Sequence, residues 1–204
     1  EQRTLESYGI GRDATIVLVR RVPGGLLDPE DDDSFIGSYR IAETLGRGAF
    51  GTVYRAANID TGEVVAIKVN EPGRTYNAEL RAFAELRAQP HANVITCIEV
   101  HLSSFAIVYE LGRLSLHDFL LRPGVLSGPN RGMLEPEARK LFKQMLAGVH
   151  HLHHNLGMAH LDLKPENWVL CGAVADDHKT LKRGVKVKLI DFGVSKMLPT
   201  DSVF

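Results

Sequence analysis

The chain of 204 residues has two cysteines, one tryptophan and no excess of basic over acidic residues. Cys97 and Cys171 cannot build a disulfide framework, which suits a reducing compartment, so we expect a cytoplasmic protein without excluding the nucleus. The 24 lysines and arginines against 25 acidic residues leave a net charge of −1, so no bulk positive field is available for nucleic acid or an anionic membrane. No apolar run approaches the ~20 residues that span a bilayer. We therefore expect no nucleic-acid partner and no membrane span.

The composition is that of a folded chain with one strongly acidic break near its start. Apolar residues make up 44% and charged residues 24% of the sequence, and the length suits one domain, or one domain with a fragment of another. Five acidic residues fall within six positions around Pro29. Such a run repels itself and stays solvated, so it predicts a linker over 26–38 between residues 1–25 and a domain over 39–204.

Short β-branched runs are followed by longer helical patterns along this domain. The first three runs predict an antiparallel meander. One helix is expected over 75–88, and another after Pro136, whose place between Glu135 and Glu137 is typical of a first helical turn. Strands followed by helices indicate an α+β fold rather than a parallel doubly wound sheet. The expected strands cover 39–45, 52–57, 64–69, 93–100 and 105–110, and the expected buried face of the second helix carries Leu141, Phe142, Met145, Leu146, Val149 and Leu152.

The first candidate binding motif is rich in glycine. Its GxGxxG pattern runs from Gly46 to Gly51 and allows three interpretations: an ordinary turn, a dinucleotide-binding fingerprint, or a flap over phosphates. A dinucleotide fingerprint needs a helix to begin at the glycines. Here the β-branched and aromatic residues Thr52, Val53 and Tyr54 follow. This favours a hairpin whose backbone amides approach phosphates.

A lysine on the third strand and a glutamate on the first helix form a candidate pair. Side chains alternate along a strand, so Ala66 and Lys68 share a face. On that face the small Ala66 leaves room for a flat ligand, and the ammonium of Lys68 can reach the ligand's phosphates. Glu79, Phe83 and Leu86 fall at i, i+4 and i+7, so they are expected to face inward. We expect Glu79 to pair with Lys68. The alternatives are a lysine at a strand edge and a glutamate in solvent.

Two further motifs decide which family the sequence resembles. The stretch 160–167 reads His-Leu-Asp-Leu-Lys-Pro-Glu-Asn, and 190–193 reads Ile-Asp-Phe-Gly. With the glycine motif and the Val-Ala-Ile-Lys run at 65–68, they stand in the order found in eukaryotic Ser/Thr protein kinases, so residues 39–204 resemble that family. The resemblance implies a bilobal fold, with an antiparallel β N-lobe that carries one helix and a helical C-lobe. It also implies ATP and Mg²⁺ as cofactors and protein Ser/Thr hydroxyls as acceptors.

The resemblance assigns roles to the residues of the two later motifs. Asp162 would accept or orient the proton of the substrate hydroxyl, and Lys164 would face the γ-phosphate. Asn167 and Asp191 are oxygen ligands suited to Mg²⁺. We expect these groups and Lys68 to converge on one triphosphate.

The resemblance also places the nucleotide beneath the glycine flap and beside the segment 108–112, which joins the lobes. Tyr109 would be the gatekeeper, the backbone of Glu110 and Gly112 would bond adenine, and Ser115 would lie near the ribose. Lys68, held by Glu79, would contact the α- and β-phosphates. The full set expected to bind ATP is Leu45, Gly46, Arg47, Gly48, Ala49, Phe50, Gly51, Val53, Ala66, Lys68, Glu79, Glu110 and Gly112.

Three features depart from the family pattern. Leu161 stands where the family usually has an arginine that pairs with a phosphate on the activation loop, so control by loop phosphorylation is not expected. The 24 positions from Asn167 to Asp191 exceed the family norm, and the surplus over 171–186 predicts an extended hairpin tip. The chain stops thirteen residues after Asp191, so we expect a truncated C-lobe and a poor kinase from these 204 residues alone. A nucleotide-binding pseudokinase or scaffold is the alternative function.

Residues 1–25 resemble a different family, the ubiquitin-like domains. The spacing over 3–10, the apolar run 14–19 and the Gly-Gly pair ending at Gly25 match the C-terminal third of ubiquitin. The resemblance implies the last strand of a β-grasp sheet at 14–19 and partners from the ubiquitin pathway. Cleavage of a precursor after Gly25 is a further alternative. The fixed φ of Pro23 argues against it, because it would obstruct a narrow protease channel.

Four histidines near the end of the second helix raise a metal-binding alternative. Residues three and four apart share a helix face, as His150, His151, His153 and His154 do. No cysteine or carboxylate cluster accompanies them in the sequence. A polar helix end, with cations favoured near the C-terminal dipole, is the better interpretation.

Overall fold

The computed structural model describes residues 34–121, 133, 135–172 and 184–199. The ubiquitin-like segment expected over 1–25 and the expected hairpin tip lie outside these residues. The chain divides into two compact units. Within the described residues, unit 1 comprises 34–88 and 96–111, and unit 2 comprises 89–95 and the part that starts at Gly112.

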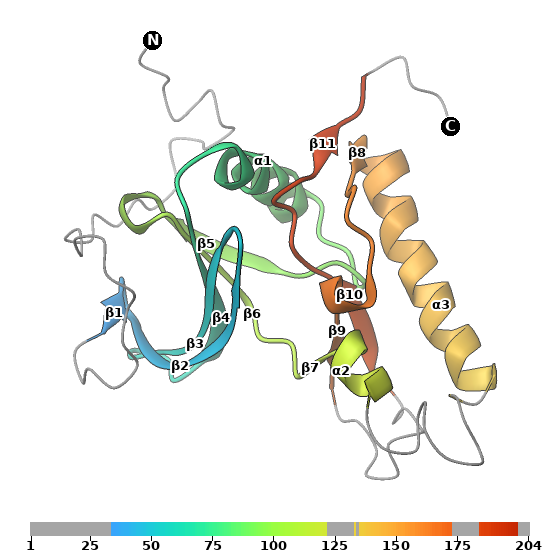
Figure 1. Ribbon diagram of the computed structural model, residues 1–204, viewed down its shortest axis with the longest axis horizontal. Helices are drawn as coiled ribbons and strands as arrows, with labels where there is room; N and C mark the ends of the chain where they lie inside the picture. The colour runs from blue at the N-terminus through green and yellow to red at the C-terminus, as the bar shows by residue number, and fades with distance from the viewer. Residues whose placement is uncertain (1–33, 122–132, 134, 173–183, 200–204) are drawn as a thin grey trace. The chain divides into compact units, whose positions relative to one another are not determined.

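Unit 1 is built on a six-stranded antiparallel sheet in the order β1-β2-β3-β4-β6-β5. Strands β2, β3 and β4 lie side by side in sequence order, which confirms the predicted meander (Figure 1). Strand β1 pairs Ile36 with Tyr39, so the sheet begins inside the range that was expected to be linker. The strands are β1 (Phe35–Ile36), β2 (Tyr39–Gly48), β3 (Gly51–Asn58), β4 (Val64–Asn70), β5 (Cys97–His101) and β6 (Ala106–Glu110), with a short 3-10 helix, η2, at Leu102–Ser104.

The two faces of β4 have different surroundings. Val65 and Ile67 are buried in an apolar cluster beneath the sheet, while the alternate residues Ala66 and Lys68 face the other way. The alternation therefore separates the core from the side on which the lysine lies. The cluster consists of Ile36, Tyr39, Ile41, Tyr54, Ala56, Val65, Ile67, Ala106 and Val108.

One helix, α1 (Arg74–Ala88), completes unit 1. It begins one residue before the predicted range, and its predicted inward residues Glu79, Phe83 and Leu86 are all buried. The Arg87 guanidinium donates to the carbonyl oxygen of Ile98 on β5 at 2.8 Å and ties the last turn to the sheet. Helix α1 thus presents a fixed face that carries one buried carboxylate.

In its described residues, unit 2 combines two α-helices with short strands. A three-stranded sheet has the order β10-β9-β7, and β11 pairs with β8. Lys186 of β10 pairs with Cys171 of β9, so the base of the expected long hairpin is present. No helix of the described residues is long and apolar enough to cross a membrane. The elements are β7 (Leu114–Ser115), α2 (Leu116–Leu121), α3 (Glu135–His150), a π-helical turn η3 (His151–Asn155), β8 (Met158–Ala159), a 3-10 turn η4 (Pro165–Asn167), β9 (Trp168–Cys171), β10 (Lys186–Leu189) and β11 (Lys196–Met197).

The strand expected over 93–100 begins only at Cys97. The buried Asn93 is held within unit 2 instead, because its Nδ2 donates to Gln144 Oε1 on α3 at 2.9 Å. Its carbonyl oxygen accepts a hydrogen bond from the Leu189 amide at 3.0 Å. The prediction was wrong for the first four residues, because these long-range partners outweigh the local β-branched pattern.

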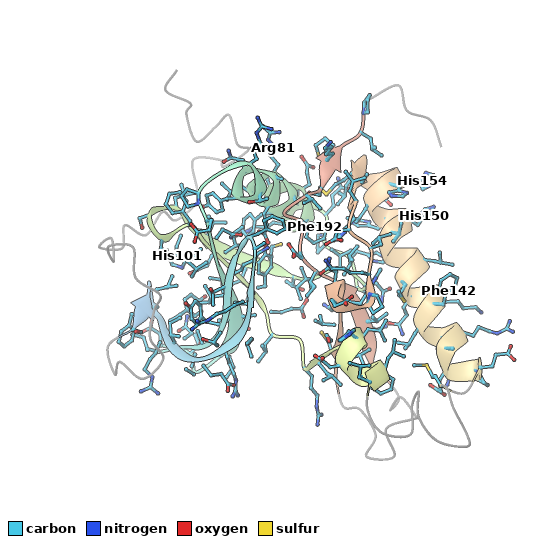
Figure 2. All side chains as sticks on the ribbon, in the orientation of Figure 1. Arg81, His101, Phe142, His150, His154 and Phe192 are labelled. Atoms are coloured by element: carbon cyan, nitrogen blue, oxygen red, sulfur yellow. The ribbon has the colours of Figure 1, made fainter. Side chains whose placement is uncertain are left out.

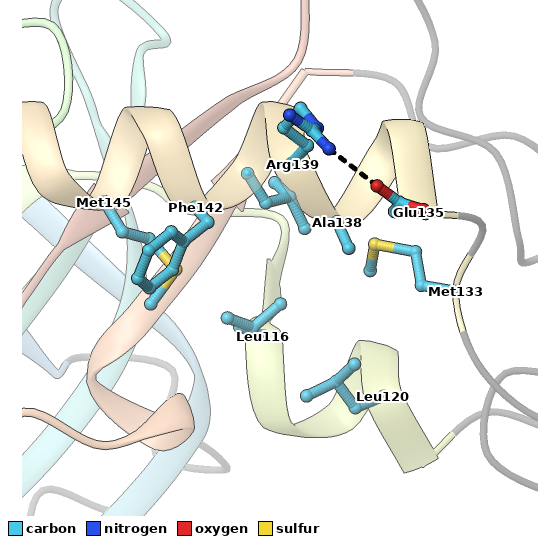
Figure 3. A pocket seen from close by; sticks show the side chains of 9 residues that line it. Leu116, Leu120, Met133, Glu135, Ala138, Arg139, Phe142 and Met145 are labelled. Carbon is cyan, nitrogen blue, oxygen red and sulfur yellow. Dashed lines mark hydrogen bonds and ion pairs between the residues drawn. The ribbon is translucent and has the colours of Figure 1, made fainter.

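The predicted buried face of α3 is only partly correct. Leu141 is 4% exposed, but Phe142 and Leu146 are 60% and 53% exposed (Figure 2). The face that meets β10 is centred instead on Gln144, whose Oε1 accepts from the Val187 amide at 3.1 Å. Among the described residues, Phe142 borders an apolar hollow between α2 and α3 that also contains Leu116, Leu120 and Met145 (Figure 3). None of the residues expected to bind ATP lines this hollow.

Candidate active site

The glycine motif forms the tip of the β2–β3 hairpin in unit 1. Gly48 pairs with Gly51 across a turn at Ala49 and Phe50, and strand β3 follows directly. A dinucleotide fingerprint, which needs a helix at this point, is excluded. Gly51 has φ +145°, and a Cβ there would strike the carbonyl oxygen of Val69, so the backbone requires glycine.

The other two glycines of the motif have no such packing reason. A Cβ added at Gly46 or Gly48 would meet no atom of the described chain within 4 Å. Both lie on the paired part of the hairpin, where Gly46 is opposite Val53. Packing therefore does not require glycine at these positions, and the close approach of a ligand to this backbone stays a prediction.

The lysine of β4 and the glutamate of α1 form a buried ion pair. Lys68 Nζ lies 2.9 Å from Glu79 Oε2 and 3.1 Å from Glu79 Oε1. The carboxylate side chain is 1% exposed and the lysine side chain 10%. A charged pair at this depth persists only when both partners are held in place, because either charge alone would be costly to bury. The predicted pairing is thus present, whereas its contact with phosphates stays a prediction.

A third side chain reaches the same carboxylate, and sequence reasoning missed it. The Tyr109 hydroxyl on β6 donates to Glu79 Oε1 at 2.9 Å. Tyr109 pairs with Ala66 on β4 and with Cys97 on β5. Burial and the charge of Glu79 raise the pKa of Cys97 to about 12, so its thiol stays protonated beside the pair.

The segment expected to bond adenine has partners of its own. The Glu110 amide donates to the Thr96 carbonyl at 3.1 Å, so a contact with adenine at Glu110 would use its carbonyl oxygen. In unit 2, a Cβ at Gly112 would lie 2.7 Å from Val169 Cβ, so glycine is required by packing. Ser115 caps α2. Its oxygen accepts a hydrogen bond from the Asp118 amide at 3.0 Å, and its hydroxyl donates to the Asp118 carboxylate at 2.7 Å. These bonds give Ser115 a structural role.

The stretch 160–167 forms a loop around one carboxylate in unit 2. Lys164 Nζ lies 2.7 Å from Asp162 Oδ2. Asn167 Nδ2 donates to the same oxygen at 2.9 Å and to the Asp162 carbonyl at 2.8 Å. The hydrogen bond from Lys164, followed by that from Asn167, holds the pKa of Asp162 below its ordinary value. The carboxylate is therefore ionised at neutral pH and fixed in direction.

The histidine that opens the loop joins it to the Ile-Asp-Phe-Gly motif. His160 Nε2 donates to the Ile190 carbonyl at 2.9 Å, and its Nδ1 accepts from the Asp162 amide at 3.3 Å. These bonds require a neutral ring, and burial lowers the pKa of His160 accordingly. The buried Phe192 packs edge-on against this ring, with centroids 5.1 Å apart.

Two residues beside these contacts adopt left-handed backbone conformations. Leu161 has φ +66° and Asp191 has φ +63°. Few residues other than glycine adopt this region, although asparagine and aspartate do so more often than leucine, and strained positions of this kind cluster at active sites. The Gly193 amide donates to Asp191 Oδ1 at 3.3 Å, which orients that carboxylate.

Comparison with known families matches residues 39–203 to the protein kinase domain. The chain belongs to this family. Carbon catabolite-derepressing protein kinase of Candida glabrata is 32% identical over 180 residues, covering 85% of this chain and 26% of that protein. Its counterpart in Saccharomyces cerevisiae is also 32% identical, over 85% of this chain and 25% of that protein. An Arabidopsis thaliana protein, SNF1-related protein kinase catalytic subunit alpha KIN12, is 31% identical over 81% of this chain and 31% of its own length. This kinase domain thus spans roughly a quarter to a third of these relatives.

The donors available for a metal in this kinase domain are oxygens. Asn167 contacts Asp162 through Nδ2, so its amide oxygen takes no part in that contact. This oxygen and the Asp191 carboxylate are hard ligands of the kind Mg²⁺ prefers, and Mg²⁺ usually takes few protein ligands because waters and phosphates supply the rest. Among the residues that the structure describes, no three His, Cys, Asp or Glu side chains are arranged to hold a metal ion by themselves.

The histidines near the end of α3 form stacked pairs. His150 and His154 stack with centroids 4.3 Å apart, and both are labelled in Figure 2. His151 stacks on His91 at 4.7 Å, and its Nε2 donates to the Gln89 carbonyl at 2.9 Å. The His151–His91 stack helps fix segment 89–95 within unit 2. Sequence reasoning missed it because the two histidines are sixty positions apart.

Proposed function

We propose that this kinase domain belongs to a Ser/Thr protein kinase that transfers the γ-phosphate of Mg-ATP to protein hydroxyls. The observation that carries the proposal is the arrangement around Asp162, which is held by Lys164 at 2.7 Å and by Asn167 at 2.9 Å. The names of the similar proteins, which are kinases, support it. The lysine at position 164 favours Ser/Thr acceptors over Tyr.

The chemistry follows from what phosphoryl transfer demands. The transferred group passes through a loose transition state, so the protein mainly positions the reactants and offsets charge. Asp162, ionised and fixed, orients the acceptor hydroxyl and takes its proton. Lys164 Nζ offsets charge on the γ-phosphate. In unit 1, Lys68 binds the α- and β-phosphates while Glu79 holds its ammonium in place.

Asn167 and Asp191 would hold Mg²⁺. A metal held there would supply positive charge that offsets part of the charge on the phosphates. The protein's own contribution is to fix the two oxygen donors: Asp162 orients Asn167, and the Gly193 amide orients Asp191.

Substitution of Asp162 tests the proposal. In the full-length protein, Asp162→Asn keeps the size of the side chain and should lower transfer of labelled phosphate to Ser/Thr peptides by about 10²-fold or more. Glu166→Gln is the matched control, because Glu166 is an exposed carboxylate of the same loop, and it should leave transfer unchanged. Equal transfer by the Asp162→Asn and wild-type proteins would reject the proposal.

Leu161 favours one other function, a nucleotide-binding scaffold without transferase activity. It replaces the family's usual arginine, is 59% exposed and has no charge to offer a phosphate. Under this alternative the protein binds Mg-ATP but transfers no phosphate to any peptide. Parallel binding and transfer assays on the same preparation separate the two functions.

We also propose the domain organisation that the sequence suggests. A ubiquitin-like segment over 1–25 and an acidic linker that ends before β1 at Phe35 would precede the kinase domain, with substrate proteins and ubiquitin-pathway proteins as partners in the cytoplasm or nucleus. The proposal rests on the spacing of residues 1–25 and their final Gly-Gly pair. Incubation with a deubiquitinating protease followed by intact-mass analysis would show whether cleavage follows Gly25, and an uncut chain would reject processing there.

A further inference from the structure

We propose that Tyr109 is a positioning residue of the nucleotide site: its hydroxyl holds Glu79 in the orientation in which that carboxylate fixes Lys68. The inference rests on the proposed function, because Lys68 matters as a phosphate ligand. Its basis is a shared acceptor. Glu79 Oε1 accepts a hydrogen bond from Tyr109 Oη at 2.9 Å and another from Lys68 Nζ at 3.1 Å.

The contact lies where water cannot replace it. Glu79 is 1% exposed, Lys68 8% and Tyr109 9%. A buried carboxylate that loses a donor keeps the cost of its lost hydration, and bonds to charged groups are the stronger kind. Removal of the hydroxyl therefore disturbs Glu79 rather than exchanging one partner for solvent.

The donor and the acceptor belong to different elements. Tyr109 lies on β6, whose backbone is paired on one side with β4 at Ala66 and on the other with β5 at Cys97. Glu79 lies on α1, whose last turn is joined to the sheet by the hydrogen bond from Arg87 to the Ile98 carbonyl. The tyrosine bond therefore fixes the helix to the sheet at the level of the ion pair.

Tyr109 becomes more important once a nucleotide is bound. The ammonium of Lys68 must then share its donors between phosphates and Glu79, which weakens its hold on the carboxylate. The phenol is a neutral donor that a phosphate attracts less strongly than it attracts the ammonium, so its bond to Oε1 persists. Tyr109 thus keeps Glu79 in place while Lys68 turns toward the ligand.

The chain supplies a matched comparison on the same helix. Tyr76 lies one turn before Glu79 and is 4% exposed, and burial together with the charge of Glu79 raises the pKa of its phenol. Within the described residues its hydroxyl has no hydrogen-bond partner. Tyr76→Phe removes a buried hydroxyl near the same carboxylate and breaks no bond to it.

The test compares Tyr109→Phe with Tyr76→Phe in the full-length protein. Dissociation constants for Mg-ATP and for adenosine, measured by calorimetry, separate the phosphate end of the site from the adenine end. We expect Tyr109→Phe to weaken Mg-ATP binding by about tenfold, the effect of one hydrogen bond to a charged group. Adenosine binding should stay unchanged because the aromatic ring is retained, and Tyr76→Phe should leave both constants unchanged. Tyr109→Met, a second replacement without a hydroxyl, should give the same loss for Mg-ATP.

A double-mutant cycle gives a further readout. Glu79→Gln removes the acceptor charge, so in that background Tyr109→Phe should cost almost nothing more. The inference is overturned if Tyr109→Phe equals Tyr76→Phe for Mg-ATP, if it weakens adenosine and Mg-ATP equally, or if the two substitutions are additive. A wild-type protein that binds no Mg-ATP would reject the proposed function itself, and the inference with it.

Discussion

Asn167 Nδ2 donates to both the carbonyl oxygen and the carboxylate of Asp162, at 2.8 and 2.9 Å. One amide therefore fixes the backbone and the side chain of the proposed base together. The amide oxygen of Asn167 takes no part in these two bonds and is the atom that the proposed function assigns to Mg²⁺. Under the proposed function Asn167 would both position Asp162 and hold Mg²⁺, and substitution can separate these two roles.

The first prediction separates the positioning of Asp162 from the binding of Mg²⁺. Asn167→Asp keeps an oxygen for Mg²⁺ but loses the donor and places a like charge beside Asp162, so kcat should fall by about 10²-fold while Mg²⁺ still increases the rise in melting temperature caused by ATP. Asn167→Ala should lose both properties. Steady-state kinetics and thermal melting with and without Mg²⁺ are the measurements. An Asn167→Asp protein with normal kcat would show that the hydrogen bonds to Asp162 are dispensable.

The second prediction concerns the pH dependence of transfer. The hydrogen bond from Lys164 holds the pKa of Asp162 below its ordinary value of 3.8, so the carboxylate stays ionised down to a lower pH than it otherwise would. Lys164→Met removes the main cause, so the pKa rises and the acid limb of the rate profile should move to higher pH. Glu166→Gln should leave the limb in place. Limbs that coincide in the wild-type and Lys164→Met proteins would contradict the assignment of Asp162 as the base.

The third prediction contrasts two glycines of the hairpin. Gly51→Ala forces a Cβ against the Val69 carbonyl at φ +145°, so it should lower the free energy of unfolding by about 1–3 kcal/mol. Gly48→Ala meets no neighbour and should leave the melting temperature unchanged. It should weaken Mg-ATP binding, because its methyl group would occupy the space that the proposed function assigns to the phosphates. Melting and calorimetry on both variants test this, and equal destabilisation by the two would argue against it.

Features set by local pattern were predictable from the sequence, whereas long-range contacts were not. The hairpin at Gly51 and the inward face that carries Glu79 follow from short-range periodicity, and both were predicted correctly. The bond between Tyr109 and Glu79 joins a strand to a helix thirty positions away, and no spacing rule reports it.

The errors have the same origin. Asn93 lies in a β-branched run, but its amide is satisfied by Gln144 on α3 and by the Val187 carbonyl on β10, so it does not enter the strand. Phe142 fits the apolar period of α3, yet only part of that stripe meets β10. Periodicity predicts that a helix has an apolar face, but the packing partners decide how much of that face is buried.

The fourth prediction follows from the side chain at position 161. Leu161 carries no charge, so a phosphate on the activation segment would find no cation at this position. Phosphatase treatment of the full-length protein, with removal of phosphate verified by intact mass, should leave kcat within about twofold of the untreated value, since a factor of two is under 0.5 kcal/mol of barrier. Leu161→Arg supplies the missing charge and should make activity sensitive to the same treatment. A wild-type enzyme that is inactivated by phosphatase would contradict this account.

The fifth prediction concerns stability in acid. His91 Nδ1 accepts a hydrogen bond from the Asn93 amide at 3.1 Å, and its ring stacks on His151. Burial, followed by the charges of His151 and His150, lowers the pKa of His91 below its ordinary 6.5. The folded protein therefore binds fewer protons there than the unfolded chain once the pH falls below about 6.5, and stability is lost as the pH drops further.

Replacement of His91 separates its contribution to acid sensitivity from that of His160, whose pKa is also lowered. Asn at position 91 can accept the Asn93 amide through its side-chain oxygen but does not titrate near neutral pH. His91→Asn should therefore melt close to wild type at pH 7.5 and lose less stability than wild type between pH 7 and pH 5. His117→Asn is the control, because the ring of His117 lies beside the carboxylates of Asp118 and Glu166 rather than another histidine, and it should not reduce the acid sensitivity. If the melting temperatures of the His91→Asn and wild-type proteins fall by the same amount between pH 7 and pH 5, the stacked pair does not sense pH.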